Sequence, residues 1–403
     1  MYEKGTGRVN VNGWAVMSHP TVYLSSVEVG FSNVCAALVG GVMFGLVNPS
    51  LGCLADRYYL SKFSTFGIFI ISGLTLRSDE IGAAAEAWPV GIFGLGSILL
   101  FTPFFSKLIL QLQLQPQEFV TGLAIFSCMP TTLSSGVALT RLAGGNSALA
   151  LAMTLVSSLL GILVVPFSIS MFIANGVGVS VPTEQLLRSL ILTLLVPLLV
   201  GKVMFLLLYA LEQVVLKEHL NVEYAHVTSF MFVPLYVVLH SPGLICDSNQ
   251  QVFRETFKGL AVFVDQNRKL LSMISALLLG LVPWIQVSRS RALLLMVKPA
   301  VFLVAVGMGA FLHLILLAFN ALSIQGLSAI SGGRKSVFAK RENASALLIV
   351  ASQKTLPVMV AVVEQLGGAL GESGLLVLPC VAAHLNQVNA VLQIFSLSFI
   401  LLF

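Results

Sequence analysis

Long apolar runs separated by short polar segments dominate the sequence. Several approach the ~20 residues that a membrane-spanning helix needs. None shows the strict two-residue alternation of a membrane β-barrel, so helices are favoured. The pattern predicts an all-α polytopic membrane protein with about ten transmembrane helices. The runs are Val29–Leu46, Phe63–Leu76, Ala87–Phe105, Glu118–Leu133, Ala148–Ala174, Leu186–Leu208, Leu270–Val287, Leu293–Leu322, Asn343–Val363 and Gly374–Phe403.

The composition agrees with a membrane protein. Of the 403 residues, 57% are hydrophobic and 10% are charged, and the mean hydropathy is +0.95, outside the range of ordinary soluble domains. The basic residues are scattered through short loops, without the aromatic-rich basic patch that nucleic-acid binding requires. With ten helices, most of them fall on the side of both termini, which predicts that this side is cytosolic or its organellar equivalent. Nothing in the pattern indicates an oligomeric state.

Two of the runs are interrupted by proline and polar residues. Pro130 precedes a Ser/Thr-rich stretch in the fourth run, and Pro357 follows closely after Lys354 in the ninth. Interrupted helices at corresponding positions of two halves are typical of inverted-repeat transporters, whose unwound main chain binds ions or substrate near the middle of the bilayer. We therefore predict one five-helix repeat over residues 28–174 and a second over residues 183–403.

Two segments lie outside this repeat pattern. We expect residues 1–27 to be poorly ordered, because they lack a long apolar run. Residues 204–252 contain only a short, mostly apolar run, Val227–Leu239, and we interpret them as an insertion that the transport core does not need, as a splice variant or a gene-model error would produce. The N-terminus has neither a secretory apolar core nor the composition of an organellar import peptide, so a targeting segment is not evident.

Hydroxyl side chains gather directly after the first interruption. Their oxygens can ligate a hard cation or donate hydrogen bonds to an anionic substrate. Single hydroxyls in membrane helices more often bond a carbonyl one turn back or pack against a neighbouring helix, but a cluster beside a proline favours binding. With two residues of the following helix, the candidates are Thr131, Thr132, Ser134, Ser135, Asn146 and Thr154.

Five stretches of the chain carry a family resemblance. They are ISGLTLRSDE (71–80), CMPTTLSSGVALTRLAGGN (128–146), VPLLVGK (196–202), ASQKTLPVMV (351–360) and LPCVAAHLNQ (378–387). In these stretches and their spacing, the chain resembles the bile acid/sodium symporter family, most closely the fourth type of its plant plastid branch, and also its seventh-member branch. The resemblance implies ten helices in two inverted repeats, with a panel domain moving against a core domain in which the interrupted fourth and ninth helices cross. It also implies a location in the plastid (chloroplast) envelope.

The resemblance further implies a set of sodium ligands. Sodium-coupled relatives hold the ions with side chains of the broken fourth helix, the fifth helix and the ninth helix. Carried over residue by residue, Ser134 and Ser135 fall near the fourth-helix ligands, and Thr154 matches a fifth-helix hydroxyl. Gln353 matches the ninth-helix glutamine.

Three positions depart from the family pattern. A second fifth-helix hydroxyl falls at Ala150, the ninth-helix glutamate falls near Ile349, and the asparagine after the glutamine is replaced by Lys354. A charged group inside the bilayer is costly and normally marks function. Since an ammonium brings positive charge to the place of a cation, we expect Lys354 to replace one sodium ion.

Lys354 leaves two modes of coupling open. The carrier keeps a single sodium site on the hydroxyls after Pro130 and on Thr154, or it couples to protons, because a lysine among apolar neighbours could cycle through its neutral form. The charge, flanked by Gln353 and Thr355, could also attract an anionic substrate. The alternative is that Lys354 lies near the membrane interface, where its stem would snorkel to water.

Further polar residues interrupt the apolar runs near the C-terminus. His384 and Gln387 lie in the tenth run, where a lone histidine is more often a packing residue, although a proton relay with Lys354 is an alternative. We expect Glu364 and Glu372, at the two ends of a Gly-rich loop, to be solvated.

The motifs favour a transporter over an enzyme. The sequence has no HExxH, GxSxG or Walker-type phosphate loop. We predict a secondary active transporter that carries a small organic anion by alternating access, coupled to sodium or, alternatively, to protons, with no other cofactor. A second hypothesis is a membrane protein that regulates cation (calcium) flux without transporting an organic solute. The substrate itself is not indicated.

Overall fold

The computed structural model describes residues 20–75, 84, 86–132, 135–174, 176, 178–179, 181–205 and 267–400, with only the backbone at 20–33, 268–269 and 388–400. All regular elements in these ranges are helices. Most of the 204–252 segment that we interpret as an insertion lies outside them, as do residues 1–19. Residues 20–27, which were expected to be poorly ordered, belong to the first helix.

The first half of the chain contains both long and short helices. They are α1 (Pro20–Val47), α2 (Pro49–Arg57), α3 (Leu60–Thr75), α4 (Trp88–Gly96), the π-helical turn η2 (Ser97–Phe101), the 3-10 turn η3 (Thr102–Phe104), α5 (Phe105–Leu110), α6 (Gln117–Ser127), α7 (Ser135–Leu142), α8 (Ser147–Ser168), the π-helical η4 (Ile169–Ala174), α10 (Thr183–Leu190) and the π-helical η5 (Ile191–Leu195), after which the helix continues to Phe205.

The second half also contains both long and short helices. Its elements are α14 (Arg268–Arg289), α15 (Arg291–Met296), α16 (Pro299–Ile330), the 3-10 turn η6 (Gly333–Lys335), α17 (Arg341–Ser352), α18 (Leu356–Leu366) and α19 (Ser373–Ile400). The apolar run Leu293–Leu322 was predicted as one helix, but the chain breaks before Pro299, which starts α16. Proline is favoured at a helix start because its missing N–H needs no partner there.

Several helices are long and apolar enough to cross a membrane. Within the described residues there are six, or up to seven if the pair Val34–Val47 and Pro49–Arg57, bent by 103°, is one span. The membrane-protein class is therefore confirmed, and the count of ten remains a prediction. The six are Trp88–Leu110, Ser147–Ala174, Thr183–Phe205, Leu270–Arg289, Pro299–Ile330 and Arg341–Leu366.

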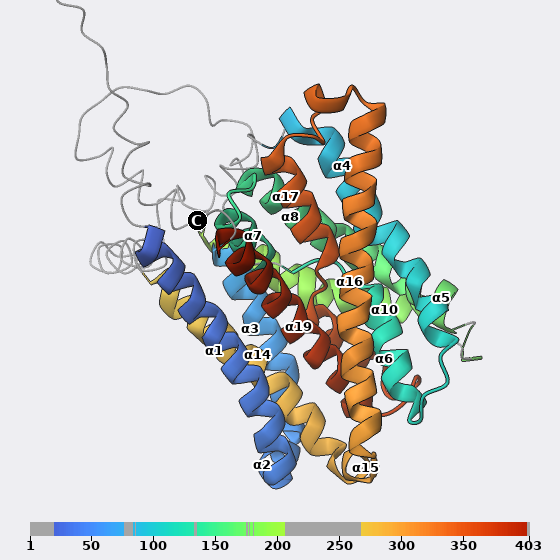
Figure 1. Cartoon of the computed structure of the whole chain (residues 1–403). Coiled ribbons are helices and arrows are strands. Elements are labelled where there is room, and N and C mark those ends of the chain that lie inside the picture. Colours follow the sequence, from blue (N-terminus) through green and yellow to red (C-terminus); the bar gives the residue numbers. More distant parts are fainter. Residues whose placement is uncertain are drawn as a thin grey trace, which may run out of the picture.

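One group of helices packs through glycines. Helix α1 runs along α14, and in Figure 1 the two lie side by side. A Cβ at Gly41 or at Gly280 would collide with the backbone of the facing helix. Gly73 of α3 and Gly201 of the Thr183–Phe205 helix meet in the same way. Small residues allow close backbone approach, which is how membrane helices gain packing energy in lipid.

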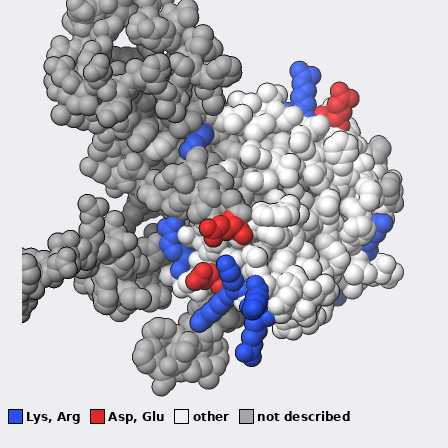
Figure 2. Space-filling model, turned by 90° about the horizontal axis from the view of Figure 1, so that it is seen from above, with Lys and Arg blue, Asp and Glu red and all other residues white. Residues whose placement is uncertain are grey.

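A second group of helices surrounds the span Arg341–Leu366, the most buried of the candidate spans in the described residues. In Figure 1, α19 lies between α16 and the α1–α14 pair, with α17 beside α7 and α8. The candidate span Arg341–Leu366 has 89% of its apolar window buried, against 28% for Pro299–Ile330. A helix that is buried on all sides forms the centre of a bundle. On the face shown in Figure 2, charged side chains are few and most of the described surface is uncharged.

Candidate functional site

Two helices of this central group are broken at the positions that the prolines predict. Helix α6 ends at Ser127, and residues 128–132 are not helical before α7 begins. Helix α17 ends at Ser352, and α18 begins at Leu356 with Pro357 in its first turn. Proline removes a helical hydrogen bond and clashes with the preceding turn, so each break is encoded locally.

The two breaks bond directly to each other. The main-chain N–H of Thr355 donates to the carbonyl of Pro130 at 3.0 Å. The Thr131 Oγ1 donates to the carbonyl of Val350 at 2.6 Å. Segments more than 200 residues apart in sequence thus meet at their non-helical points, and each break satisfies polar main-chain groups of the other.

Gln353 joins the same crossing through its side chain. Its Oε1 accepts a hydrogen bond from Thr132 Oγ1 at 2.9 Å, and Thr132 Oγ1 accepts one from the N–H of Gly136 at 3.1 Å. A Cβ at Gly136 would lie 3.3 Å from both oxygens, so glycine leaves room for them. The Nε2 of Gln353 is buried and has no hydrogen-bond partner among the described atoms. One end of this amide is therefore free to bind a ligand.

Lys354 lies at the centre of the crossing. Its side chain is 0% exposed. Its Nζ donates to the carbonyl of Ile98 at 3.1 Å, to Thr102 Oγ1 at 2.5 Å and to the carbonyl of Met129 at 2.8 Å. An ammonium has three donors, and all three are used. Within the described chain no carboxylate pairs with it, so neutral oxygens alone hold the charge.

The geometry of the Trp88–Leu110 helix explains why the carbonyl of Ile98 is available. The helix widens into the π-turn η2 and then tightens into η3, which contains Pro103. Proline offers no N–H to the preceding turn, and π-turns often occur at functional sites. Thr102 and Ile98 were not among our candidates, although Pro103 inside an apolar run was a signal that could have found them.

Side chains of α16 and α19 bond three further main-chain groups of the second break. Gln387 Oε1 accepts from the N–H of Lys354 at 3.0 Å, and His384 Nδ1 lies 3.3 Å from the carbonyl of Lys354. His313 Nδ1 lies 3.1 Å from the carbonyl of Ser352. The contacts of His384 and Gln387 are thus with the main chain of the break. A break is tolerated at membrane depth when protein side chains cover it in this way.

Asn320 extends this support to the neighbouring helix. Its Nδ2 donates to Ser352 Oγ at 3.2 Å, and its Oδ1 accepts from Ser97 Oγ at 2.8 Å. Asn320 and His313 belong to the buried stripe of α16. Neither was a candidate, and only their polar character within an apolar run distinguished them.

The structure does not bring every candidate to the crossing. Asn146 caps α8 by accepting from Leu149 N, and its Nδ2 donates to Asn343 Oδ1 at 2.9 Å, so it ties the α7–α8 turn to the start of α17. Thr154 is buried on α8, and its Oγ1 has no hydrogen-bond partner among the described atoms. Ser135 begins α7. Ser134 lies outside the described residues.

The expectation that Glu364 is solvated is wrong. Ser61 Oγ donates to its Oε1, and Gln286 Nε2 donates to the same oxygen at 2.8 Å. The carboxylate, at the far end of α18, is therefore held between α3 and α14. Glu372 is exposed, as expected.

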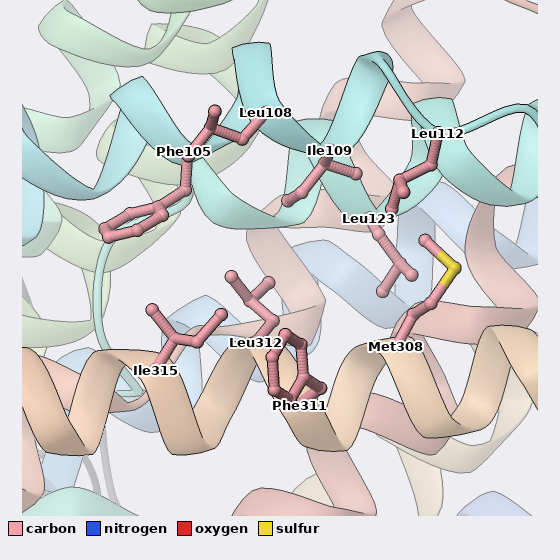
Figure 3. Close-up of a pocket in the computed structure, with 9 residues that line it drawn as sticks. All are labelled: Phe105, Leu108, Ile109, Leu112, Leu123, Met308, Phe311, Leu312 and Ile315. Carbon is pink, nitrogen blue, oxygen red and sulfur yellow. The ribbon is translucent and has the colours of Figure 1, made fainter.

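A separate cavity of about 280 Å³ opens beside α5 and α16. Figure 3 shows that its lining is entirely apolar, with Phe105 and Ile109 of α5 on one side and Phe311, Leu312 and Ile315 of α16 on the other. Such a lining offers no ligand to a cation or to an anionic substrate, so the polar crossing is the better candidate site.

Comparison with known proteins identifies the family. Residues 32–395 match the SBF-like CPA transporter family. The chain belongs to this family. It is 60% identical over 352 residues to "Probable sodium/metabolite cotransporter BASS4, chloroplastic" of Arabidopsis thaliana, which covers 87% of this chain and 69% of that protein. The protein of the same name from Oryza sativa subsp. indica is 54% identical over 368 residues, 91% of this chain and 75% of the relative.

A more distant similarity connects the chain to animal proteins. It is 34% identical over 155 residues to "Sodium/bile acid cotransporter 7-A" of Xenopus laevis, covering 38% of this chain and 45% of the relative. These matches confirm the resemblance that the sequence motifs carry, and they confirm a transporter rather than an enzyme. The family match spans both helix breaks and the residues that surround Lys354.

Proposed function

We propose that this member of the SBF-like CPA transporter family is a sodium-coupled secondary transporter of a small organic anion, with the ion and substrate bound at the crossing of the two helix breaks. The observation that carries the proposal is the meeting of both breaks around the buried Lys354. Transporters place binding sites where unwound helices meet near the middle of the bilayer. The names of the relatives, sodium/metabolite and sodium/bile acid cotransporters, support the coupling ion.

The proposed architecture is ten helices in two inverted five-helix repeats. The broken helices α6–α7 and α17–α18 would occupy equivalent positions in the two repeats. The glycine-packed group of α1, α3, α14 and the Thr183–Phe205 helix would move against the group that holds the crossing. Such rocking of one bundle against the other alternately exposes a fixed site.

Lys354 takes the place of one cation in this proposal. Three oxygens at 2.5 to 3.1 Å surround its ammonium, a ligand set of the kind that a hard cation would use. A neutral amine would lose one of these charge-assisted donations and would have to accept from the Thr102 hydroxyl, which would break the bond of that hydroxyl to the Ile98 carbonyl. The three donations therefore favour a permanent ammonium, and hence sodium over protons as the coupling ion. The fixed positive charge also favours an anionic substrate.

One sodium site remains next to Lys354 in the proposal. Gln353, Thr132 and Thr154 offer buried oxygens, and Ser134 and Ser135 follow on the first break. Gln353 bonds Thr132 through one end of its amide and leaves the other end free. Rotation of the amide would turn its oxygen toward an ion, and the same group could otherwise donate to a carboxylate of the substrate.

We propose that the protein carries out this transport across the plastid envelope. The support comes from the chloroplastic relatives in Arabidopsis thaliana and Oryza sativa, which match 87% to 91% of this chain.

Reconstitution tests the proposed function. Purified protein in liposomes should accumulate organic anions when an inward sodium gradient is imposed, and a pH gradient alone should not replace it. Gln353→Leu should abolish uptake, whereas Gln325→Leu, at an exposed site on α16, should not. Absence of gradient-dependent uptake across a broad panel of organic acids would instead support the cation-regulating hypothesis.

A further inference from the structure

A second buried polar cluster lies away from the crossing. It consists of Glu364 on α18, Ser61 and Thr65 on α3, and Gln286 on α14. Glu364 follows Lys354 by ten residues, which corresponds to about 15 Å along a helix. The cluster is therefore a separate site, where the crossing group meets the glycine-packed group.

Two oxygens of this cluster are buried without a partner. Gln286 is 0% exposed, and its Oε1 has no hydrogen bond, although the Nε2 of the same amide contacts Glu364. Thr65 is 2% exposed, and its Oγ1 also has no partner among the described atoms. Thr65 follows Ser61 by one helical turn, so both lie on the same face of α3. Unpaired buried oxygens are rare in native proteins and require an explanation.

No basic side chain in the described structure forms an ion pair with Glu364, although the charge of Lys62 acts on the carboxylate from a distance. Lys62, next to Ser61 in sequence, holds its Nζ over the ring of Tyr59 at 5.1 Å. Arg289, one turn after Gln286, pairs with Asp56 at 3.4 Å. Both hydrogen bonds to Glu364 end on Oε1, so Oε2 keeps its acceptor capacity. A partly buried carboxylate without a directly bonded counter-charge is unfavourable unless a cation or proton joins it.

We propose that Glu364, Gln286, Ser61 and Thr65 form a second sodium site. The four side chains offer a carboxylate, an amide oxygen and two hydroxyls, which are the ligand types of hard cations. Their total charge of one negative unit matches a monovalent ion. An ion bound there would use the orphaned oxygens of Gln286 and Thr65 and would neutralise Glu364.

The position of the site gives the ion a role in the transport cycle. Ser61, Thr65 and Gln286 belong to α3 and α14, whereas Glu364 belongs to the broken helix. Bound sodium would hold the two helix groups together on this side, and its release would let them separate. The role in the cycle rests on the proposed function, but sodium binding itself does not.

Direct sodium binding tests the site without any substrate. Full-length protein in lipid nanodiscs is titrated with ²²Na⁺ at constant ionic strength, with choline as the replacement cation. We expect Glu364→Gln to lose one class of sodium site, and Thr65→Val to weaken that class by about tenfold. Glu372→Gln removes an exposed carboxylate, and Ser64→Ala removes a hydroxyl bonded within its own helix, so neither should change binding.

The outcomes separate this site from the crossing. Gln353→Leu should remove sodium from the crossing and leave the Glu364 class intact. Unchanged sodium binding in both Glu364→Gln and Thr65→Val would overturn the second site, even if sodium-driven uptake is found. Competition by potassium with the same affinity as sodium would also overturn it. If Glu364→Gln does not fold, Thr65→Val, which preserves shape, decides the question.

Discussion

The buried Lys354 and the partly buried Glu364, on the same broken helix, have opposite surroundings. Lys354 is surrounded by three oxygens, and the main chain around it is bonded to α16 and α19. Glu364 has two hydrogen-bond donors on one oxygen, and two neighbouring oxygens have no partner. Since unsatisfied buried polar groups are costly, the complete set of partners on the Lys354 ammonium indicates a fixed structural charge. An incomplete one indicates a place for a ligand.

The two charges also differ in the helices that they connect. The crossing lies within one packed group of helices, whereas the Glu364 cluster joins two groups. A permanent ammonium suits a place that keeps its geometry throughout transport. A diffusible ion suits an interface that opens in the proposed transport cycle.

Replacement of Lys354 should have the largest effect. Lys354→Met preserves much of the volume but removes three charge-assisted hydrogen bonds and leaves the Met129 carbonyl without its partner, so we expect a loss of about 3 kcal/mol. The thermal unfolding midpoint in detergent micelles measures the loss, and uptake should fall with it. Lys335→Met, at an exposed lysine, is the control. A variant with wild-type stability and uptake would show that the ammonium is dispensable.

Removal of a support for the break should have the next largest effect. Gln387→Leu leaves the N–H of Lys354 without its acceptor, which should cost about 1–3 kcal/mol of folding free energy. Chemical denaturation followed by helical circular dichroism measures the change, and Gln325→Leu provides the exposed control. An equal effect at both glutamines would contradict a specific role for Gln387.

Thr102→Val should have a smaller effect, because the other two oxygens still hold Lys354. The hydroxyl accepts from the Lys354 ammonium and donates to the Ile98 carbonyl, so we expect a loss of about 1.5 kcal/mol, the low end for a hydrogen bond to a charged group. The matched control is Thr193→Val, since the Thr193 hydroxyl bonds back to Ser189 within its own helix. Thermal unfolding of the two variants side by side checks the difference, and a larger loss at Thr193 would weaken the assignment.

Glu364→Gln should have the smallest effect on stability when sodium is absent. The glutamine can still accept from Ser61, so we expect a change below about 1 kcal/mol. The wild type should gain stability as sodium replaces choline, and the variant should not, because the ion stabilises only the state that binds it. Thermal unfolding across a sodium titration measures this. An equal gain in thermal stability on adding sodium in both proteins would show that Glu364 does not bind the ion.

The sequence predicted the two breaks because their causes are local. Pro130 and Pro357 cannot continue a helix, and Lys354 inside an apolar run indicated a buried functional position. The sequence did not predict the partners of Lys354, since Thr102 lies 252 residues away in the chain. It assigned Asn146 to the binding candidates, whereas the structure uses it to cap α8 and to bond Asn343. Glu364 was misjudged because a charge near a loop is usually solvated.

The sequence by itself determined the helical membrane class, the family and the positions of both breaks, because hydropathy and proline act over a few neighbouring residues. Only the tertiary structure decided which oxygens receive the ammonium of Lys354 and which side chains hold Glu364. The three partners of Lys354, which are Met129, Thr102 and Ile98, lie 225 to 256 residues away from it in the sequence. Ser61 lies 303 residues away from Glu364. Contacts over such separations depend on how the helices pack, and no local pattern specifies them.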